Sequence, residues 1–406
     1  PLTVRVTASG TDSSLSRMAA LVAVAERART RYTSLADRAA RAYAPWVHIL
    51  ALVAFLGWLW VSQGDIRLSL NVAVAVLIIT CPCALGLAVP AVMTAATGRL
   101  FRQGLLVKDG TALERLAEVD TVVFDKTGTL TTGKPVAELP DGLSADVLGV
   151  ARSLGEGSGH PMAQALASAL SDVPAVALDG VTECPGDGVC GLWAGTEVRL
   201  GRATWVGAED PAERGPATWL RIGNDAPVQI SFRDALRPGA ADAVKALKAQ
   251  GFGVMLLSGD GAAPVRDMAR TLGIDDWQAD VRPEDKSDVI TALQTDGAKV
   301  LMVGDGLNDT VALAGAHVSL SPASALDAAR VASDMVLLGQ DLSVLGDALA
   351  TARSAQVRIR ENFAVATLYN AVAVPIALLG FATPLAAALA MSLSSISVSL
   401  NALRVR

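Results

Sequence analysis

The heptapeptide Asp125-Lys-Thr-Gly-Thr-Leu-Thr131 is the segment of this sequence with the clearest chemical potential. It follows an apolar stretch, Thr121–Phe124, which we predict to be a strand, and parallel α/β sheets place their active sites at the carboxyl ends of strands. An aspartate carboxylate can attack a phosphoryl group and become an aspartyl phosphate. The glycine and threonines that follow offer backbone N–H groups and hydroxyls to phosphate oxygens. A lone Asp at a strand end is often only a helix cap, but the whole heptapeptide predicts a phosphoryl-transfer site.

Three later segments carry side chains that phosphoryl transfer would need. Ser258-Gly259-Asp260 follows the apolar stretch Val254–Leu257, and Gly304-Asp305-Gly306-Leu307-Asn308-Asp309 follows Val300–Val303. Lys286 lies between them, in Arg-Pro-Glu-Asp-Lys. Each segment alone is more often a turn than a site. Their order and their placement at strand ends predict that they act together.

The chemistry of these side chains suggests how they would divide the work. Phosphoryl transfer needs Mg²⁺, a positive charge on the transferred phosphate and accurate positioning. Asp125 and Asp305 can hold Mg²⁺ through oxygen ligands. Lys286 can neutralise the phosphate, and Ser258 can donate a hydrogen bond to it.

The composition limits the kinds of structure that can position these residues. The chain has 406 residues, of which 51% are hydrophobic and only 18% charged, whereas soluble globular proteins average about 25% charged residues. Disorder, collagen and small disulfide scaffolds are excluded, and four cysteines are too few for a disulfide framework. A net charge of −6 offers no basic face for a nucleic-acid partner.

The apolar residues gather in three charge-free stretches, Ala42–Gly64, Leu68–Gly98 and Asn362–Leu403. A membrane-spanning helix needs about 20 such residues, and the turn residues of Gly380–Pro384 divide the third stretch in two. Buried helices of a soluble core are the alternative, but charge-free runs of this length favour a membrane. The sequence therefore predicts four spans, at 44–63, 68–98, 362–380 and 384–403.

Arginines flank these stretches on the side of the long segment 99–361, so the positive-inside rule places that segment and both termini in the cytoplasm. Within it, apolar strands such as Thr121–Phe124 alternate with helical stretches such as Gly239–Gln250, a pattern that predicts a parallel α/β sheet. Residues 133–230 are rich in Gly, Pro and Asp and break this alternation. We predict that they form a second domain inserted into the first.

The motifs DKTGTLT, SGD, PEDK and GDGLND together resemble those of the P-type ATPases, within the haloacid-dehalogenase-like phosphotransferases. Asp234-Ala-Leu-Arg237-Pro238 resembles the DxxRP segment that the family carries on the hinge between its nucleotide and phosphorylation domains. The resemblance implies membrane helices, a Rossmann-like phosphorylation domain and an inserted α+β nucleotide-binding domain. It also implies that ATP, with Mg²⁺, phosphorylates Asp125. The implied catalytic residues are Asp125, Lys126, Thr127, Ser258, Gly259, Asp260, Lys286, Asp305, Asn308 and Asp309, and the implied Mg²⁺ ligands are Asp125, Thr127 and Asp305.

The predicted inserted domain resembles that of the heavy-metal branch. Ser158-Gly-His160-Pro161 is similar to its His-Pro motif, whose His contacts adenine; the less favoured alternative is a His on a surface loop. Pro185-Gly186-Asp-Gly188-Val resembles its glycine-rich nucleotide loop, and glycine lets a backbone approach a ligand closely. The implied nucleotide-binding residues are His160, Pro161, Gly186, Gly188 and Gly201. The chain departs from the family at Gly159, where some metal pumps carry Glu, and at Thr310-Val311, where Ala-Pro is usual.

The transported ion is suggested by Cys81-Pro82-Cys83 within the predicted span 68–98. Proline kinks a helix, and thiolates select soft metals such as Cu(I) or zinc, although two membrane cysteines can also be small packing residues. The last two predicted spans contain no charge and no His, whereas the zinc/cadmium branch carries a Lys and an Asp there. Their Tyr-Asn pair and Met-Ser-Leu-Ser-Ser segment resemble the copper(I) branch. The implied ligands of transported copper are Cys81, Cys83, Tyr369, Asn370, Met391 and Ser395.

Ala316–Ala325, together with SGD, resembles the FixI/CcoI-type copper pumps linked to assembly of cytochrome oxidase. We therefore predict a multi-pass protein of the cell (inner) membrane that exports copper(I) from the cytoplasm at the expense of ATP. A copper chaperone would deliver the ion, and membrane lipid would surround the spans. The alternatives are a zinc/cadmium/lead pump and a membrane-tethered phosphatase or binding module that transports nothing.

The sequence begins with Pro1 and contains no Thr-Gly-Glu dephosphorylation loop, so we expect an amino-terminally truncated chain. The predicted organisation has six parts. The parts are 1–41, the end of an actuator domain and a linker; 42–98, two transmembrane helices; 99–132 and 231–350, the phosphorylation domain; 133–230, the nucleotide-binding domain; and 351–406, two transmembrane helices.

Overall fold

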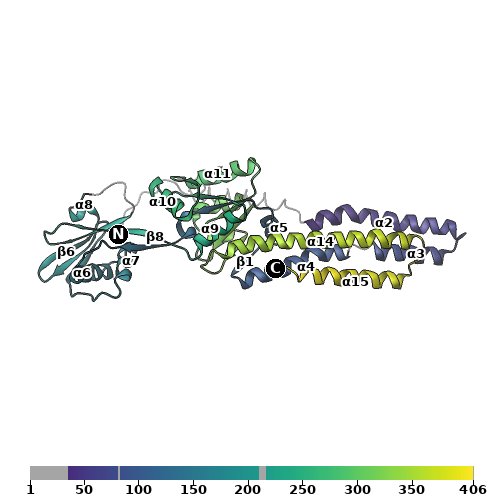
Figure 1. The fold of residues 1–406 in the computed structure, drawn as a ribbon, viewed down its shortest axis with the longest axis horizontal. Coiled ribbons are helices and arrows are strands. Elements are labelled where there is room, and N and C mark those ends of the chain that lie inside the picture. The colour runs from purple at the N-terminus through teal and green to yellow at the C-terminus, as the bar shows by residue number, and fades with distance from the viewer. Residues whose placement is uncertain (1–34, 81–82, 210–215, 406) are drawn as a thin grey trace, which may run out of the picture.

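The computed structural model describes residues 35–80, 83–209 and 216–405. The molecule is elongated: a helical bundle lies at one end, a mainly parallel sheet with its helices lies in the middle, and a second sheet lies at the other end (Figure 1). The predicted actuator remnant, 1–41, falls largely outside the described residues.

The bundle is built from helices that come from the two ends of the described chain. They are α2 (Leu35–Val61), α3 (Ile66–Ile79), α4 (Cys83–Arg102), α14 (Val344–Leu378) and α15 (Pro384–Ala402). Small side chains such as Ala51, Ala54 and Ala377 fill its interior, while large apolar side chains such as Leu368 and Leu385 point outward and are 68% and 72% exposed. An apolar outer surface of this extent suits contact with lipid.

Two helices among the described residues, α14 and α15, are long and apolar enough to cross a membrane. They contain all but the last one or two residues of the predicted spans 362–380 and 384–403. The apolar stretches Pro45–Val61, which is part of α2, and Ile66–Ile79 are shorter than this length. The predicted span 68–98 is divided between α3 and α4: α3 ends at Ile79, and its C-cap Thr80, whose hydroxyl donates to the Val76 carbonyl at 2.6 Å, stands two positions before Pro82, a residue with no N–H to continue a helix.

The central sheet has the strand order β1-β13-β12-β11-β2-β9-β10, and only β1 runs antiparallel to its neighbour. The strands are β1 (Leu105–Val107), β2 (Thr121–Asp125), β9 (Gly253–Leu257), β10 (Asp276–Gln278), β11 (Val300–Val303), β12 (Val318–Pro322) and β13 (Met335–Leu337). Strand β2 lies between β11 and β9 and is parallel to both. The loops that follow these three strands therefore meet at one edge of the sheet.

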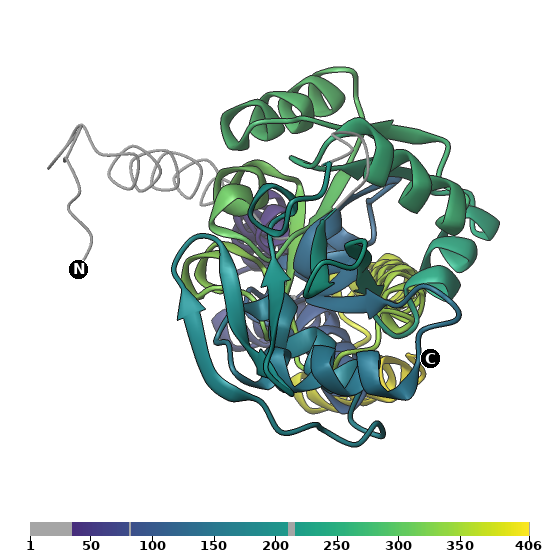
Figure 2. The same cartoon turned by 90° about the vertical axis from the view of Figure 1, so that its left-hand side faces the viewer.

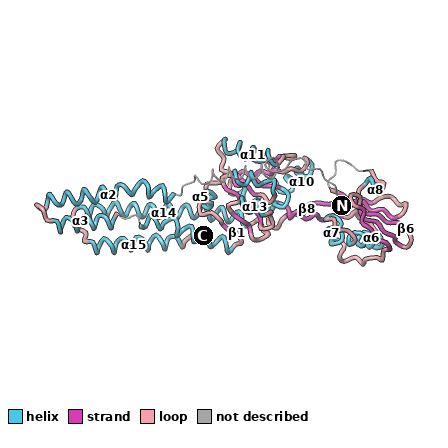
Figure 3. Tube along the Cα trace, turned by 180° about the vertical axis from the view of Figure 1, so that it is seen from behind, coloured by secondary structure: helices cyan, strands magenta, loops and turns pink. Residues whose placement is uncertain are grey.

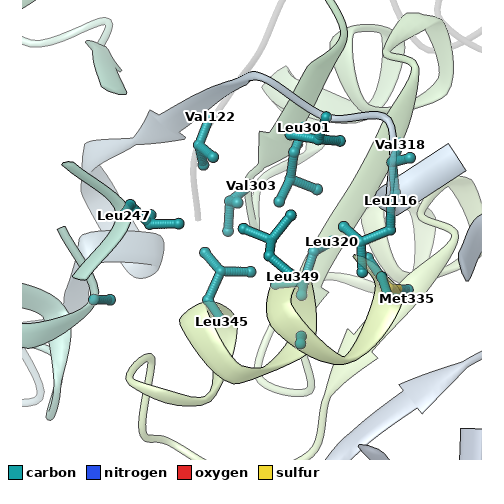
Figure 4. Close-up of a cluster of buried hydrophobic side chains, with 14 of the residues drawn as sticks. Leu116, Val122, Leu247, Leu301, Val303, Val318, Leu320, Met335, Leu345 and Leu349 are labelled. Atoms are coloured by element: carbon teal, nitrogen blue, oxygen red, sulfur yellow. The ribbon is translucent and has the colours of Figure 1, made fainter. Parts of the chain in front are cut away.

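Helices cover both faces of this sheet, because successive side chains of a strand point to opposite faces. On one face, Val122 and Leu301 pack with Leu349 of α14 (Figure 4); on the other, Val123 packs with Ile290. The helices around the sheet are α5 (Ala112–Leu116), α9 (Ala240–Ala249), α10 (Ala262–Leu272), α11 (Pro283–Thr295), α12 (Thr310–Gly315) and α13 (Asp327–Ala332). Helix α14 is thus one 35-residue helix that joins the sheet's core to the bundle (Figure 1). Seen end-on, the second sheet lies in front and the bundle helices lie behind it (Figure 2).

The second sheet is antiparallel, with the order β3-β8-β7-β6-β5-β4. Its strands are β3 (Thr131–Glu138), β4 (Asp179–Cys184), β5 (Gly188–Trp193), β6 (Thr196–Gly201), β7 (Ala217–Ile222) and β8 (Val228–Leu236), and its helices are α6 (Ala145–Glu156), α7 (Pro161–Ala169) and α8 (Ala203–Val206). Leu154 of α6 and Leu166 of α7 pack against its strands. The paired strands β3 and β8 carry the chain from the central sheet into this one and back (Figure 3).

Candidate functional site

A cleft of about 510 Å³ lies where β2, β9 and β11 end. Nine of the ten predicted catalytic residues line it, and Lys126 is the exception. The other lining residues, which the sequence did not single out as site residues, are Asp280, Val281, Arg282, Pro283 and Gly306. The parallel order of the three strands thus gathers side chains from four distant segments of the sequence.

Lys286 makes two buried ion pairs in this cleft. Its Nζ lies 2.5 Å from Asp125 Oδ1 and 2.7 Å from Asp309 Oδ1, and these three residues are 4%, 5% and 2% exposed. Lys286 stands in the first turns of α11, which begins with Pro283, a residue whose fixed φ suits a helix start. Burial alone would lower the pKa of Lys286, but the charges of Asp125 and Asp309 outweigh it and raise the pKa. One ammonium group therefore offsets two buried carboxylates.

The carboxylates of Asp125, Asp305 and Asp309 place one oxygen each within 4.8 Å of the others. Burial, and then the charge of Asp309, raises the pKa of Asp125 to about 7 and that of Asp305 to about 6. Three carboxylates beside one lysine leave a surplus of negative charge, and oxygen-rich sites of this kind suit Mg²⁺. The residues present fit the predicted Mg²⁺.

Gly128 shapes the loop after β2. Its φ of +72° lies in the left-handed region, and a Cβ at this position would overlap the carboxylate of Asp305. The buried Arg237 holds the loop from the other side, since its Nε donates to the Thr129 carbonyl at 2.8 Å and its Nη2 donates to the Gly128 carbonyl. The sequence placed Arg237 on an expected hinge but not at the site; the structure shows that this arginine also binds the loop that follows Asp125.

Lys126 does not line the cleft, and its ammonium group binds two other carboxylates. Its Nζ lies 2.5 Å from Oδ2 of Asp260, which does line the cleft, and 3.2 Å from Asp234 Oδ2. Asp260 Oδ2 also accepts from the hydroxyls of Thr127 and Ser258, each at 3.3 Å. Burial alone would raise the pKa of Asp260, but these donors and Lys126 outweigh it and lower the pKa. Lys126 therefore positions the loop, and the hydroxyl of Thr127, a predicted Mg²⁺ ligand, bonds to Asp260.

A second pocket, of about 380 Å³, lies on the second sheet and is lined by four predicted nucleotide-binding residues, His160, Gly186, Gly188 and Gly201. Pro161, the fifth, is the first residue of α7, and His160 caps this helix by accepting a hydrogen bond at Nδ1 from the Met162 N–H, at 3.3 Å.

Two different structural constraints require glycine in this pocket. A Cβ on Gly188 would overlap the Leu200 carbonyl, and a Cβ on Gly201 would overlap the Asp187 carbonyl, so the turn and β6 pass at a distance that only glycine allows. Gly186 faces open space and is required by its φ of +90°. The pocket also contains residues that the sequence did not assign, including Glu183, which accepts a hydrogen bond from Ser158 at 2.6 Å.

The structure describes the side chains of four of the six predicted copper ligands. Tyr369 and Asn370 are half-buried on α14, and Met391 and Ser395 are half-buried on α15. Asn370 lines a cavity of about 320 Å³ together with Thr80 and Trp46, and the Tyr369 hydroxyl is buried without a hydrogen-bond partner among the described residues. Cys81 lies outside the described residues, and Cys83 begins α4, which packs against both α14 and α15.

Comparison with known proteins identifies the family. A family model for haloacid dehalogenase-like hydrolases matches residues 119–317. The nitrogen fixation protein FixI of Rhizobium meliloti (strain 1021) is 46% identical over 407 residues, covering 100% of this chain and 54% of that protein. The crystal structure of a zinc-transporting PIB-type ATPase in the E2.Pi state superposes with a TM-score of 0.86 at 29% identity, covering 98% of this chain and 68% of that one. The chain belongs to the heavy-metal, P1B-type P-type ATPases.

Other relatives of this P1B-type chain carry transport in their names. The copper-transporting P-type ATPase of Rhizobium leguminosarum bv. viciae is 38% identical over 424 residues, covering 98% of this chain and 50% of that protein. The chain spans about half the length of the curated relatives that it matches. The predicted family is confirmed, and so is the predicted fold class of a haloacid-dehalogenase-like domain, a nucleotide-binding domain and membrane helices.

Proposed function

We propose that the protein is an ATP-driven exporter of copper(I) that works through an aspartyl phosphate on Asp125. The observation that carries the proposal is the buried contact of Lys286 with Asp125 and Asp309 at the carboxyl end of β2, beside an open cleft. Such a carboxylate is a nucleophile that phosphate can reach, and the cation beside it can offset the charge of an incoming phosphoryl group.

In the proposed phosphorylation step, an oxygen of Asp125 attacks the γ-phosphorus of ATP. The new P–O bond forms as the bond from the γ-phosphorus to the bridging oxygen breaks, and ADP leaves. Lys286 offsets the negative charge that the phosphoryl group brings into the cleft, and Ser258 donates a hydrogen bond to it. Mg²⁺, held by oxygens of Asp125, Thr127 and Asp305, would add positive charge at the phosphate.

We propose that the second pocket binds the adenine end of ATP, with His160 at the start of α7 and the glycine-rich turn opposite it. Because only β3 and β8 connect this sheet to the central one in the described chain, the pocket can move toward Asp125 as a unit. Arg237, just after β8, bonds to the loop that follows Asp125, so a change of hinge angle would reach the nucleophile directly.

The choice of copper(I) follows from the ligands available in the membrane. The segment from Asn362 to Leu403 carries no charge and no His, and it offers thioether, amide and hydroxyl groups. With the thiols of Cys81 and Cys83, these groups suit a soft monovalent ion better than a hard divalent one. Relatives named as FixI and as copper-transporting ATPases are in line with this choice. We extend the proposal to an inner-membrane protein with cytoplasmic catalytic domains, supplied by a copper chaperone and serving cytochrome oxidase assembly.

Zinc, cadmium or lead is the second candidate cargo, because the zinc-transporting PIB-type ATPase shares the fold over 98% of this chain. The absence of a charged residue in the last two apolar segments argues against a divalent ion, which would need a counter-charge there.

The decisive experiment joins the two halves of the proposal. In membranes that contain the protein, radiolabelled ATP should give an acid-stable, hydroxylamine-sensitive phosphoprotein, and Asp125→Asn should abolish it. Sealed inside-out vesicles should accumulate copper(I), but not zinc, in the presence of ATP, and Cys81→Ala should abolish the uptake. Uptake of zinc in place of copper would overturn the choice of cargo, and labelling that survives Asp125→Asn would overturn the site.

A further inference from the structure

Two cysteines outside the membrane segment face each other beside the second pocket. Cys184 ends β4 and Cys190 lies in β5, and their Sγ atoms are 3.9 Å apart. In the strand pairing Gly188 stands opposite Cys184 and Thr182 stands opposite Cys190, so the two thiols are diagonal neighbours on one face of the sheet. Both residues are half-buried.

We propose that Cys184 and Cys190 form a second soft-metal site, which binds one copper(I) ion at the rim of the nucleotide pocket. Thiolates are soft ligands that favour copper(I) over Mg²⁺. With a metal–sulfur bond of about 2.3 Å, one ion can bridge two sulfurs up to about 4.6 Å apart. The observed separation fits within this limit without any shift of the backbone.

A disulfide fits the same pair less well. The sulfurs of a disulfide lie about 2.05 Å apart, so these two would have to approach each other by almost 2 Å, and an oxidant would be needed. Metal binding needs no oxidant: two thiols and one copper(I) ion give a copper(I) bis-thiolate and release two protons. Burial, and then the neighbouring Cys184, raises the pKa of the Cys190 thiol, so metal must displace the proton of this thiol.

The surroundings can accept the single negative charge of such a complex. Arg199 of β6 stands directly opposite Cys190, and its guanidinium is attractive toward a thiolate there. Glu197 opposes this effect and also bonds to Arg199, at 3.0 Å. The charges of Arg199 and Glu197 therefore nearly cancel before metal binds, and together they do not strongly repel a pair of thiolates.

Metal at this site would act on nucleotide binding. Cys184 lines the nucleotide pocket and directly precedes Pro185 and Gly186, so an ion that joins it to Cys190 would clamp the two ends of the glycine-rich turn. The complex would also place a negative charge beside an anionic nucleotide. We expect bound copper(I) to weaken ATP binding severalfold, and thermodynamic reciprocity requires ATP to weaken copper binding by the same factor.

The test uses the full chain with Cys81→Ser and Cys83→Ser, in which Cys184 and Cys190 are the only thiols of the original four. Anaerobic titration with copper(I) against a colorimetric chelator should show one ion per chain, with a thiolate-to-metal absorbance in the ultraviolet. Adding Cys190→Ser should remove both signals, and adding Ser153→Ala, a change on α6 away from the pair, should not. Circular dichroism confirms that each variant is folded.

Several results would overturn the proposal. The first is that the chain with Cys81→Ser and Cys83→Ser binds no copper(I), and the second is that stoichiometric binding survives Cys190→Ser. The third is that the two cysteines bind no metal under reducing conditions but form a disulfide in air, which mass spectrometry detects as the loss of two hydrogens. An ATP affinity that is unchanged by saturating copper(I) would overturn the coupling. Since the membrane cysteines are absent from this chain, the outcome is independent of whether the protein exports copper.

Discussion

The cleft beside Asp125 and the helical bundle place their polar groups in opposite ways. In the cleft, Asp125, Lys286 and Asp309 are ionisable groups, at most 5% exposed, and the Lys286 ammonium lies 2.5–2.7 Å from an oxygen of each carboxyl group. In the bundle, Tyr369 and Met391 are neutral and half-buried on helices whose neighbours are apolar. A charge inside a membrane is costly, whereas the sheet edge can balance charges by bringing distant segments together. The cleft thus suits a hard cation such as Mg²⁺ beside Lys286, and the bundle suits a soft cation.

The largest effect is expected from Asp125→Asn, which removes the nucleophile and keeps its size. Phosphoenzyme formation should fall below detection, because an amide oxygen cannot form the acyl phosphate. Labelling with radioactive ATP measures it, and the exposed Asp296→Asn serves as the matched control. Residual labelling of the Asn variant would show that the cleft does not carry the reaction.

Lys286→Ala tests whether charge balance maintains the cleft. Two buried carboxylates would lose their shared cation, and loss of one partner of a buried pair costs about 3–5 kcal/mol. The penalty should be largest above pH 7 and should fade below it, because the pKa of Asp125, already raised to about 7, would rise further and protonation would remove the charge. Urea unfolding in EDTA at pH 8 and pH 5 measures this, and an equal loss at both values would refute it.

Gly128→Ala tests the geometry of the same cleft without changing its charge. The added Cβ would overlap the Asp305 carboxylate at a φ of +72°, and the left-handed region alone costs a residue with a Cβ about 1–2 kcal/mol. Mg²⁺-dependent phosphorylation should fall at least about tenfold. Gly110→Ala is the matched control, since a Cβ there meets no atom within 4 Å. Equal activities of the two variants would contradict the contact.

The smallest effect is expected in the bundle, from Met391→Leu, which keeps the volume and removes the thioether. If Met391 is one of several copper ligands, its loss should weaken copper-stimulated ATP hydrolysis about tenfold, equivalent to about 1.4 kcal/mol, and leave ATP affinity unchanged. Activity measured over a range of copper concentrations, with nucleotide binding as the internal control, gives both values. A variant with unchanged copper dependence would remove Met391 from the path and sharpen the contrast with the cleft.

The local pattern of apolar and polar residues predicted much of the fold. The expected strand Thr121–Phe124 is β2, and the expected helix Gly239–Gln250 contains α9, because alternating and helical periodicities act within a few residues. The division of 68–98 into two helices was harder to predict, since hydropathy reports length but not where a helix ends. The side-chain direction of Lys126 was also beyond the sequence, because it depends on where Asp234 and Asp260 stand in the folded chain.

The sequence by itself determined the candidate nucleophile, the glycine-rich turn and the apolar segments, since each is a property of residues close together in the chain. The tertiary structure alone decided which groups meet. Lys286 reaches Asp125 across 161 positions because β11 and β9 flank β2, and Gly128 leaves room for Asp305 because the loops after β2 and β11 share one edge. Cys184 and Cys190 lie close in sequence, yet only the diagonal register of β4 and β5 brings their sulfurs to 3.9 Å. The order and register of the strands set these distances, and no single segment of the sequence specifies either of them.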